Sequence, residues 1–214
     1  MKKISCGFLL VGSLLLSLFA FASDQPDPAK EVTRLADAYV KGYLERFPES
    51  AAFAGTTLPH NDRFFDNSEA AYRAWEKRED GWLTELAKID ESALVGKPEW
   101  VTYGFLRKAL ESGRGLRVCR EELWTVNQIG GWQTSMPDYL GLLPVGTPER
   151  RADLLKQWST LPKFLETDIA NLKAGLAAGY STPKHNVELV IAQLDGYLSV
   201  PAEKSPLYAP ALRD

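Results

Sequence analysis

The side chains with the clearest capacity for metal or nucleophilic chemistry are two histidines and one cysteine. His60 and His185 are the only histidines in the 214 residues, and a zinc site needs three or four ligands, so carboxylates would have to complete it. His185 and Glu188 are one helical turn apart and could share a face, but such spacing is common by chance. The chain has no HExxH sequence. We therefore predict no metal ligand, no catalytic residue and no cofactor bound by this chain.

Cys119 and the pair Glu121-Glu122 also have non-catalytic interpretations. A nucleophilic cysteine needs a histidine base nearby in space, and both histidines are far from Cys119 in sequence. We interpret Cys119 as a small buried hydrophobe. Sequence neighbours such as Glu121 and Glu122 point to different sides of a helix or strand, so we expect them to be ion-paired or solvated.

Aromatic and amide side chains flank the double glycine Gly130-Gly131. Trp124, Trp132 and Gln133 could line a substrate cleft, because loops rich in aromatic residues often do so. Packing in the protein interior is an equally good interpretation of the same three residues.

Apolar residues that recur every three or four positions predict the helices that must position these side chains. Asp27, Ser68 and Thr147 stand where helix N-caps are expected. The helices expected are 28–47, a short turn at 48–55, 69–89, 98–111 ending at a break over 112–115, 137–142, 148–178 with a kink or break at Pro162, and one from about 183 that carries apolar residues to Leu198. Arg73, Lys77, Arg78, Glu79 and Asp80 should form the solvated side of the helix 69–89.

The pattern predicts a mainly α protein, an irregular bundle of about six helices that is the N-terminal part of a larger helical fold. Residues 116–133 are the least helical stretch, and one or two short strands are expected there at most. The formal net charge is -3, which gives no basic footprint for nucleic acid. Phosphate-binding loops, dinucleotide fingerprints and a GxSxG elbow are absent from the sequence.

The N-terminus has the three regions of a secretory signal peptide. Lys2 and Lys3 precede an apolar run over 8–19, and Ala20-Phe21-Ala22 is a small-x-small cleavage site. We predict a signal peptide over 1–22, cleavage after Ala22 and export to the periplasm or beyond. Residues 23–214 should then form the helical domain, without a membrane partner and with Cys119 as the remaining cysteine.

Three groups of residues together resemble a known family. They are Phe47-Pro48-Glu49-Ser50-Ala51 to Gly55; Cys119-Arg120-Glu121-Glu122-Leu123-Trp124 followed by Gly131-Trp132; and Pro144-Val145-Gly146-Thr147 with Leu161-Pro162 and the stretch 171–180. In these features the chain is similar to exported bacterial proteins known as domain of unknown function 885.

The resemblance implies a longer, mainly helical protein whose C-terminal half is similar to a zinc metallopeptidase. That half would supply zinc-activated water and a glutamate base for peptide hydrolysis, and its histidine–glutamate motif has no counterpart here. We therefore expect this chain to be the N-terminal half of such a protein, inactive alone, with the other half or a peptide substrate as partner. The alternative is a non-enzymatic periplasmic module for binding or interaction.

Overall fold

The computed structural model describes residues 26–56, 62–205 and 207, so the predicted signal peptide and His60 lie outside the described residues. The mainly α prediction is confirmed: the described part contains seven α-helices and four short 3-10 helices. In chain order they are α1 (Pro28–Arg46), α2 (Pro48–Phe53), α3 (Glu69–Leu86), η1 (Glu91–Leu94), α4 (Glu99–Leu116), η2 (Arg117–Cys119), η3 (Glu121–Leu123), α5 (Trp132–Leu142), α6 (Pro148–Ala177), α7 (Lys184–Leu198) and η4 (Ala202–Lys204).

Residues 116–133, all of them described, contain no strand, which is consistent with the expectation of one or two short strands at most. Leu116 ends α4, and two 3-10 helices follow before α5 begins at Trp132. Arg120 joins η2 to η3 with a left-handed backbone, φ 47°. The chain reverses through tight turns here, and such turns leave no periodic pattern in the sequence.

The predicted N-caps are confirmed by hydrogen bonds. The side chain of Asp27 accepts from the N–H of Ala29 at 3.1 Å, Ser68 accepts from Ala71 at 3.3 Å, and Thr147 accepts from Arg150 at 3.3 Å. Each bond satisfies an N–H that the first turn of a helix leaves without a partner.

Two predicted interruptions do not break their helices. α4 continues through 112–115 to Leu116, and Gly113 has a packing role there, since a Cβ on it would lie 2.9 Å from Glu79 Oε1. α6 is one helix with Pro162 inside it. A proline removes one helical hydrogen bond, but the helix does not end at Pro162. The predicted C-cap is present beyond α6: Gly179 has φ 87°.

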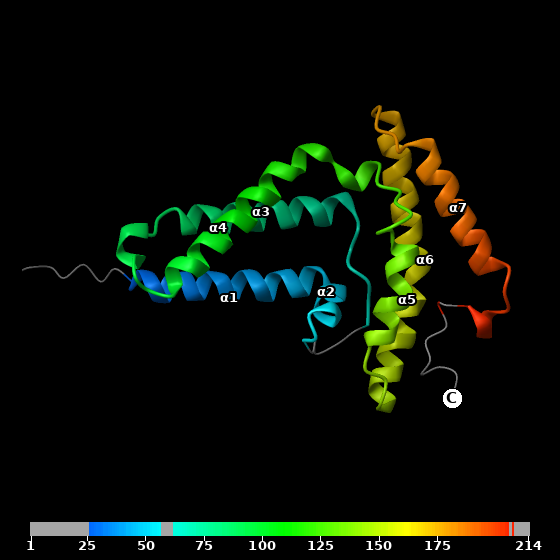
Figure 1. Cartoon of the computed structure of the whole chain (residues 1–214), viewed down its shortest axis with the longest axis horizontal. Coiled ribbons are helices and arrows are strands. Elements are labelled where there is room, and N and C mark those ends of the chain that lie inside the picture. Colours follow the sequence, from blue (N-terminus) through cyan, green and yellow to red (C-terminus); the bar gives the residue numbers. More distant parts are fainter. Residues whose placement is uncertain (1–25, 57–61, 206, 208–214) are drawn as a thin grey trace, which may run out of the picture.

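The N-terminal lobe consists of α1 to α4, with α1, α3 and α4 lying side by side (Figure 1). Its buried core is formed by Val32, Leu35, Leu86, Leu94, Tyr103, Leu106 and Leu110. Glu79 was expected on the solvated side of α3, and that was wrong. Its side chain is buried and forms an ion pair with Arg117 Nη2 at 3.0 Å, which ties the end of α4 to α3.

The C-terminal lobe consists of α5, α6 and α7, which run crosswise to the N-terminal lobe (Figure 1). Its buried core is formed by Met136, Tyr139, Leu140, Leu143 and Leu154, with Phe64 from the segment before α3. The short α2 contacts both α1 and α5, so it connects the two lobes.

Candidate functional site

The two lobes are joined through the segment 62–68, which leads into α3. Asn67 is buried, and its side-chain amide donates to the carbonyl of Phe164 in α6 at 3.0 Å. In return, the amide of Asn171 donates to the carbonyl of Asn67 at 2.8 Å. These reciprocal bonds fix the start of α3 against the middle of α6.

A continuous row of aromatic rings crosses this junction. Centroid distances are 5.5 Å for Trp82–Trp75, 5.7 Å for Trp75–Phe47, 5.9 Å for Phe47–Phe65 and 5.3 Å for Phe65–Phe164. These spacings are those of favourable tilted and edge-to-face pairs. We call these five residues the aromatic row; it leads from the N-terminal lobe to α6.

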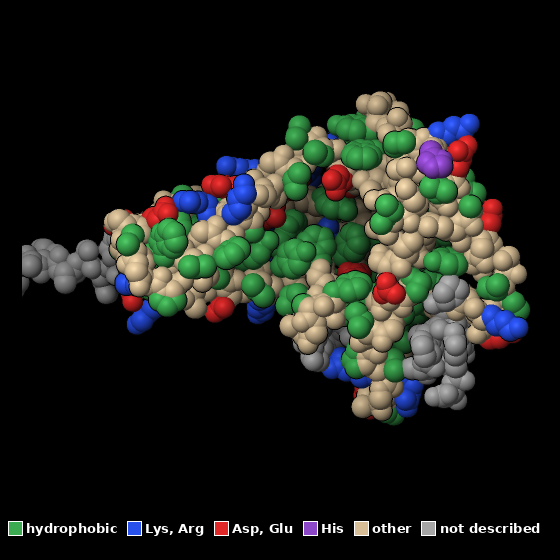
Figure 2. All heavy atoms as spheres, in the orientation of Figure 1, with side chains coloured by type: hydrophobic (Ala, Val, Ile, Leu, Met, Phe, Trp, Pro, Cys, Tyr) green, Lys and Arg blue, Asp and Glu red, His purple; other side chains and the backbone are tan. Residues whose placement is uncertain are grey.

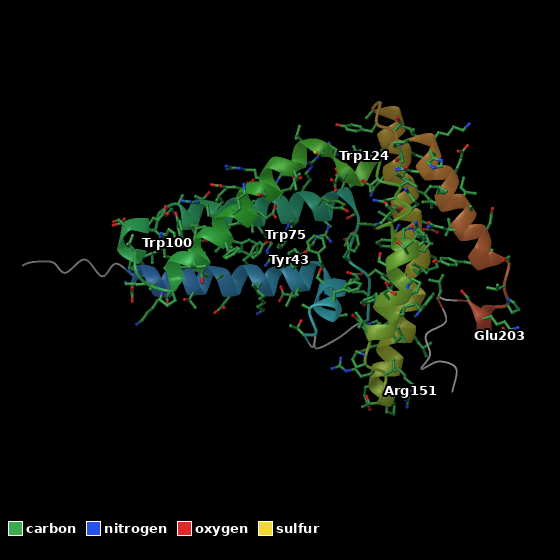
Figure 3. All side chains as sticks on the ribbon, in the orientation of Figure 1. Tyr43, Trp75, Trp100, Trp124, Arg151 and Glu203 are labelled. Atoms are coloured by element: carbon green, nitrogen blue, oxygen red, sulfur yellow. The ribbon has the colours of Figure 1, made fainter. Side chains whose placement is uncertain are left out.

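The molecule is hollowed where the lobes meet, and hydrophobic side chains gather around that hollow (Figure 2). Tyr43 from α1 and Trp75 from α3 lie in the space between their helices (Figure 3), with ring centroids 6.2 Å apart. Trp75 is buried, whereas Tyr43 is 37% exposed. The aromatic row is therefore reached from solvent beside Tyr43.

Arg46, the last residue of α1, is embedded in this aromatic surrounding. Its guanidinium carbon lies 4.8 Å from the ring centroid of Phe47, 5.5 Å from that of Phe65 and 5.2 Å from that of Tyr72. All three guanidinium nitrogens are buried and have no hydrogen-bond partner among the described residues. Burial lowers the pKa of Arg46, and the ring faces supply the compensating attraction.

Glu49 lies in the first turn of α2, just after Arg46 at the end of α1. Its Oε1 accepts from the backbone N–H of Phe65 at 3.0 Å, while Oε2 is buried without a hydrogen-bond partner in the described part. Burial raises the pKa of Glu49 and outweighs the opposing charge of Arg46. Burial also raises the pKa of Asp168 on α6 and of Tyr72 on α3.

The junction therefore holds a polar cluster of Arg46, Glu49, Tyr72 and Asp168, in which Arg46 interacts with Glu49 and Tyr72, and Tyr72 with Asp168. Carboxyl groups with raised pKa keep a proton more readily, which is a property both of general acids and of carboxyls buried for structural reasons. The partnerless Oε2 of Glu49 and its backbone bond favour the structural role, in which the cluster fixes how α1, α3 and α6 meet.

Sequence reasoning missed Arg46, Tyr72 and Asp168 as members of a site. One signal was available: Arg46 follows Tyr39 by about two helical turns, so it lies on the apolar stripe of α1. A positively charged side chain on the apolar face of a helix indicates that its charge is buried or surrounded by other side chains.

The three residues predicted to line a cleft lie in two places. Gln133 is 2% exposed, and its amide nitrogen donates to Asn127 O at 2.9 Å and to Gln193 Oε1 at 3.0 Å. Trp132, beside it at the start of α5, packs on the core of the C-terminal lobe. Trp124 (Figure 3) donates from Nε1 to Cys119 O at 2.7 Å. Their role in lining a substrate cleft stays a prediction.

The other candidates are accounted for individually. Cys119 is partly exposed rather than fully buried. Glu122 is ion-paired with Arg120 at 2.5 Å, as expected for this glutamate. His185 is exposed on α7, and Glu188 pairs with Lys184 at 3.5 Å. Within residues 26–56 and 62–205, no three histidine, cysteine or acidic side chains are grouped so that they could hold a metal ion.

A membrane-spanning helix needs about 20 predominantly apolar residues. Of the helices that the structure describes, none combines the length and apolar character required to cross a bilayer.

Comparison with known proteins identifies the chain at the level of its family. None of the curated proteins compared matches it. A family model described as "Bacterial protein of unknown function (DUF885)" matches residues 48–214, a range that includes α2 to α7, the segment 62–68 and most of the polar cluster. Because the match covers well over half of the sequence, the chain belongs to the DUF885 family of bacterial proteins.

Proposed function

We propose that this chain supplies a non-catalytic helical wall of the substrate cleft in an exported, peptidase-like hydrolase. The metal site and the catalytic base would come from a polypeptide that carries the histidine–glutamate motif implied by the family resemblance. The aromatic row and the exposed Tyr43 would face an extended peptide, which binds aromatic-lined surfaces through apolar side chains.

The observation that carries the proposal is the apolar surface of the C-terminal lobe. On α6, Leu155, Ile169 and Leu176 are each more than half exposed. Ile169 follows Leu155 by about four helical turns and Leu176 follows Ile169 by about two, so the three side chains lie on one face of the helix. On α7, Ile191 and Leu198 are also more than half exposed and about two turns apart. Helices with apolar residues on such faces normally bury them against another element.

Zinc, the metal that the family resemblance implies, does not fit the residues described here. The described carboxylates and His185 do not converge on one point. We derive no chemical step through zinc from this chain, and the proposal assigns it binding and positioning of the substrate.

The test is made on the purified mature chain with zinc, a peptide mixture and a hydrophobic dye. We expect no zinc-dependent hydrolysis and strong dye binding, because large apolar side chains on α6 and α7 are exposed in the part of the chain that the structure describes. Replacing Leu176 and Leu198 by lysine should reduce dye binding. The matched control Val95→Lys changes a side chain of similar exposure, 71%, that lies outside both helices, and should leave dye binding unchanged.

Two outcomes would contradict the proposal. Peptide hydrolysis that needs zinc and is abolished by a chelator would place the chemistry in this chain. A compact, cooperatively melting monomer that binds no dye would favour the alternative, a self-sufficient helical binding module. Export is tested separately, by mass spectrometry of the secreted or periplasmic chain for an N-terminus at Ser23.

A further inference from the structure

A surface groove separates α1 from α3 within the N-terminal lobe. Its volume is about 370 Å³, and its charged and aromatic lining comes from Lys41, Gly42 and Glu45 on α1 and Arg78, Trp82 and Glu85 on α3. A groove of this size is within the range that holds a small organic ligand.

The guanidinium of Arg78 is held in a defined position at this groove. Its central carbon lies 5.0 Å from the ring centroid of Trp82 and 5.6 Å from that of Trp75. Gly42 makes room for it: a Cβ at this position would come within 2.5 Å of Arg78 Nη2 and 2.8 Å of the Trp82 ring. The indole faces orient the guanidinium, and its Nη2 lies against α1 at Gly42. Its N–H groups have no hydrogen-bond partner among the described residues and can donate within the guanidinium plane.

The hydrogen-bonding capacity of Arg78 is unused within the described part of the chain. Several other arginines there are paired with carboxylates, among them Arg107 with Glu91 at 2.8 Å and Arg117 with Asp80 at 2.9 Å. Arg78 is exposed and has only its two ring contacts among the described interactions. An oriented guanidinium without a carboxylate is suited to bind an external one through two parallel hydrogen bonds.

The charges around the groove determine what kind of anion fits. Glu85 is ion-paired with Arg34 at 2.5 Å. The remaining charged side chains of the groove are Lys41 and Arg78, which are positive, and Glu45, which is negative. The balance is one positive charge, which suits a ligand with a single carboxylate. Glu45 would repel a doubly charged anion such as phosphate.

We propose that the groove between α1 and α3 binds a single carboxylate next to an apolar group, as found in a free amino acid or at the C-terminus of a peptide. Arg78 binds the carboxylate, Lys41 adds positive charge, and the edge of Trp82 contacts the apolar group. This site shares Trp82 and Trp75 with the aromatic row, but it involves no residue of α6 or α7 and its test does not depend on hydrolysis.

The test measures binding to the full chain by tryptophan fluorescence and calorimetry. N-acetyl-leucinate should bind saturably, and N-acetyl-leucinamide, which lacks the carboxylate, should bind at least about ten-fold more weakly. Free leucine, a peptide ending in leucine and the same peptide with a C-terminal amide distinguish the two sources of the carboxylate. Tighter binding of either carboxylate source than of the amide supports the site.

Variants test the residues. Arg78→Gln should weaken N-acetyl-leucinate binding about ten-fold or more, and Arg78→Lys several-fold, because lysine cannot form the planar pair of bonds. Arg114→Gln is the matched control, since Arg114 is an exposed arginine that lines a different groove, of about 400 Å³. It should leave binding unchanged. Gly42→Ala keeps every charge but displaces the guanidinium, so it should also weaken binding.

Circular dichroism of each variant shows whether it is folded. If Arg78→Gln does not fold, Arg78→Lys, which keeps the positive charge and a long aliphatic side chain, provides the test. Equal binding of the carboxylate and the amide would overturn the proposal. Binding by a folded Arg78→Lys variant as tight as that of the unchanged chain would also overturn it. Tighter binding of inorganic phosphate than of N-acetyl-leucinate would show a general anion patch instead.

Discussion

Both lobes have an apolar core but bury different polar side chains, Glu79 in the N-terminal lobe and Gln157 in the C-terminal lobe. In the N-terminal lobe, Val32, Leu35, Leu94 and Leu110 are fully buried hydrocarbons supplied by three different elements. In the C-terminal lobe, Gln157 is among the most buried residues; its amide donates to Tyr139 Oη at 2.6 Å and to Arg63 O at 3.1 Å. Burial raises the pKa of Tyr139 to about 12, although the hydrogen bond with Gln157 opposes this shift.

The difference teaches where each lobe obtains its stability. A buried aliphatic side chain contributes about 1.5–3 kcal/mol by leaving water, whereas a typical hydrogen bond contributes a net 0.5–1.5 kcal/mol, roughly. The N-terminal lobe therefore has what an independent core needs. The C-terminal lobe adds directional polar contacts to its apolar core. Both lobes leave large apolar side chains exposed, such as Phe105 at 76% and Leu198 at 84%, and exposed apolar faces are suited to pack against another element.

The largest expected effect is a cavity in the N-terminal core. Leu35→Ala should lower the free energy of unfolding by about 2–5 kcal/mol, because the lost side chain leaves a void among α1, α3 and α4. Val40→Ala, on the same helix but 53% exposed, should change it by less than about 0.5 kcal/mol. Urea unfolding of both variants measures the difference. Equal effects would mean that the N-terminal lobe has no distinct core.

The second prediction concerns the close contact between Gly175 in α6 and the backbone of η3. A Cβ on Gly175 would lie 1.8 Å from the carbonyl oxygen of Leu123 in η3. Gly175→Ala should therefore push α6 away from η3 and destabilise the chain by about 1–3 kcal/mol. Gly196→Ala is the control, since a Cβ there meets no atom within 4 Å, and it should stabilise α7 by roughly 0.5–1 kcal/mol. The melting temperature should therefore fall for Gly175→Ala and rise for Gly196→Ala. A rise for both variants would contradict a tight contact at Gly175.

Local chemistry allowed part of this fold to be predicted from the sequence. Asp27, Ser68 and Thr147 identify helix starts because a cap depends only on the three residues that follow it. The left-handed Arg120 had no such signal, since non-glycine residues adopt this conformation only where the surrounding structure requires it. For that reason the two 3-10 helices within 116–133 could not be predicted from the sequence.

Contacts between distant residues account for most of what could not be predicted. Gly113 suggested a helix break, but its small size serves the approach of Glu79 from α3. The candidate site shows the same limit. Arg46 and Glu49 are neighbours in sequence, yet their burial depends on Phe65 and Tyr72, which are brought there by the segment 62–68 and α3.

The third prediction tests the bond that joins the lobes. Asn67→Ala removes the hydrogen bond to Phe164 O and should destabilise the chain by about 1 kcal/mol. Hydrogen exchange should rise locally, at the start of α3 and the middle of α6. Asn186→Ala is the control, because the described hydrogen bond of Asn186 comes from its backbone N–H. A uniform rise in exchange across both lobes would contradict a local junction.

The smallest expected effect is the pH-dependent contribution of Glu49, in the polar cluster, to the stability of the fold. Burial raises its pKa above the ordinary 4.5, so the folded state favours the neutral carboxyl. That stabilising contribution is complete below the pKa of the unfolded chain and is lost as the pH rises through the higher pKa of the folded chain. Glu49→Gln resembles the neutral form and keeps an oxygen to accept from Phe65. We therefore expect this variant to melt above the unchanged chain at pH 7, with the difference disappearing below about pH 4.5.

Glu149→Gln provides a control of opposite sign, at the exposed start of α6. A backbone hydrogen bond, followed by one with the Thr147 side chain, lowers the pKa of Glu149. Its contribution to stability is present above the ordinary pKa and is lost as the pH falls through the lowered value. At pH 7 this variant should therefore melt below the unchanged chain. If Glu49→Gln shifted in the same direction as Glu149→Gln, attraction between Glu49 and Arg46 would outweigh burial, and the polar cluster would act as an ion pair that joins the lobes.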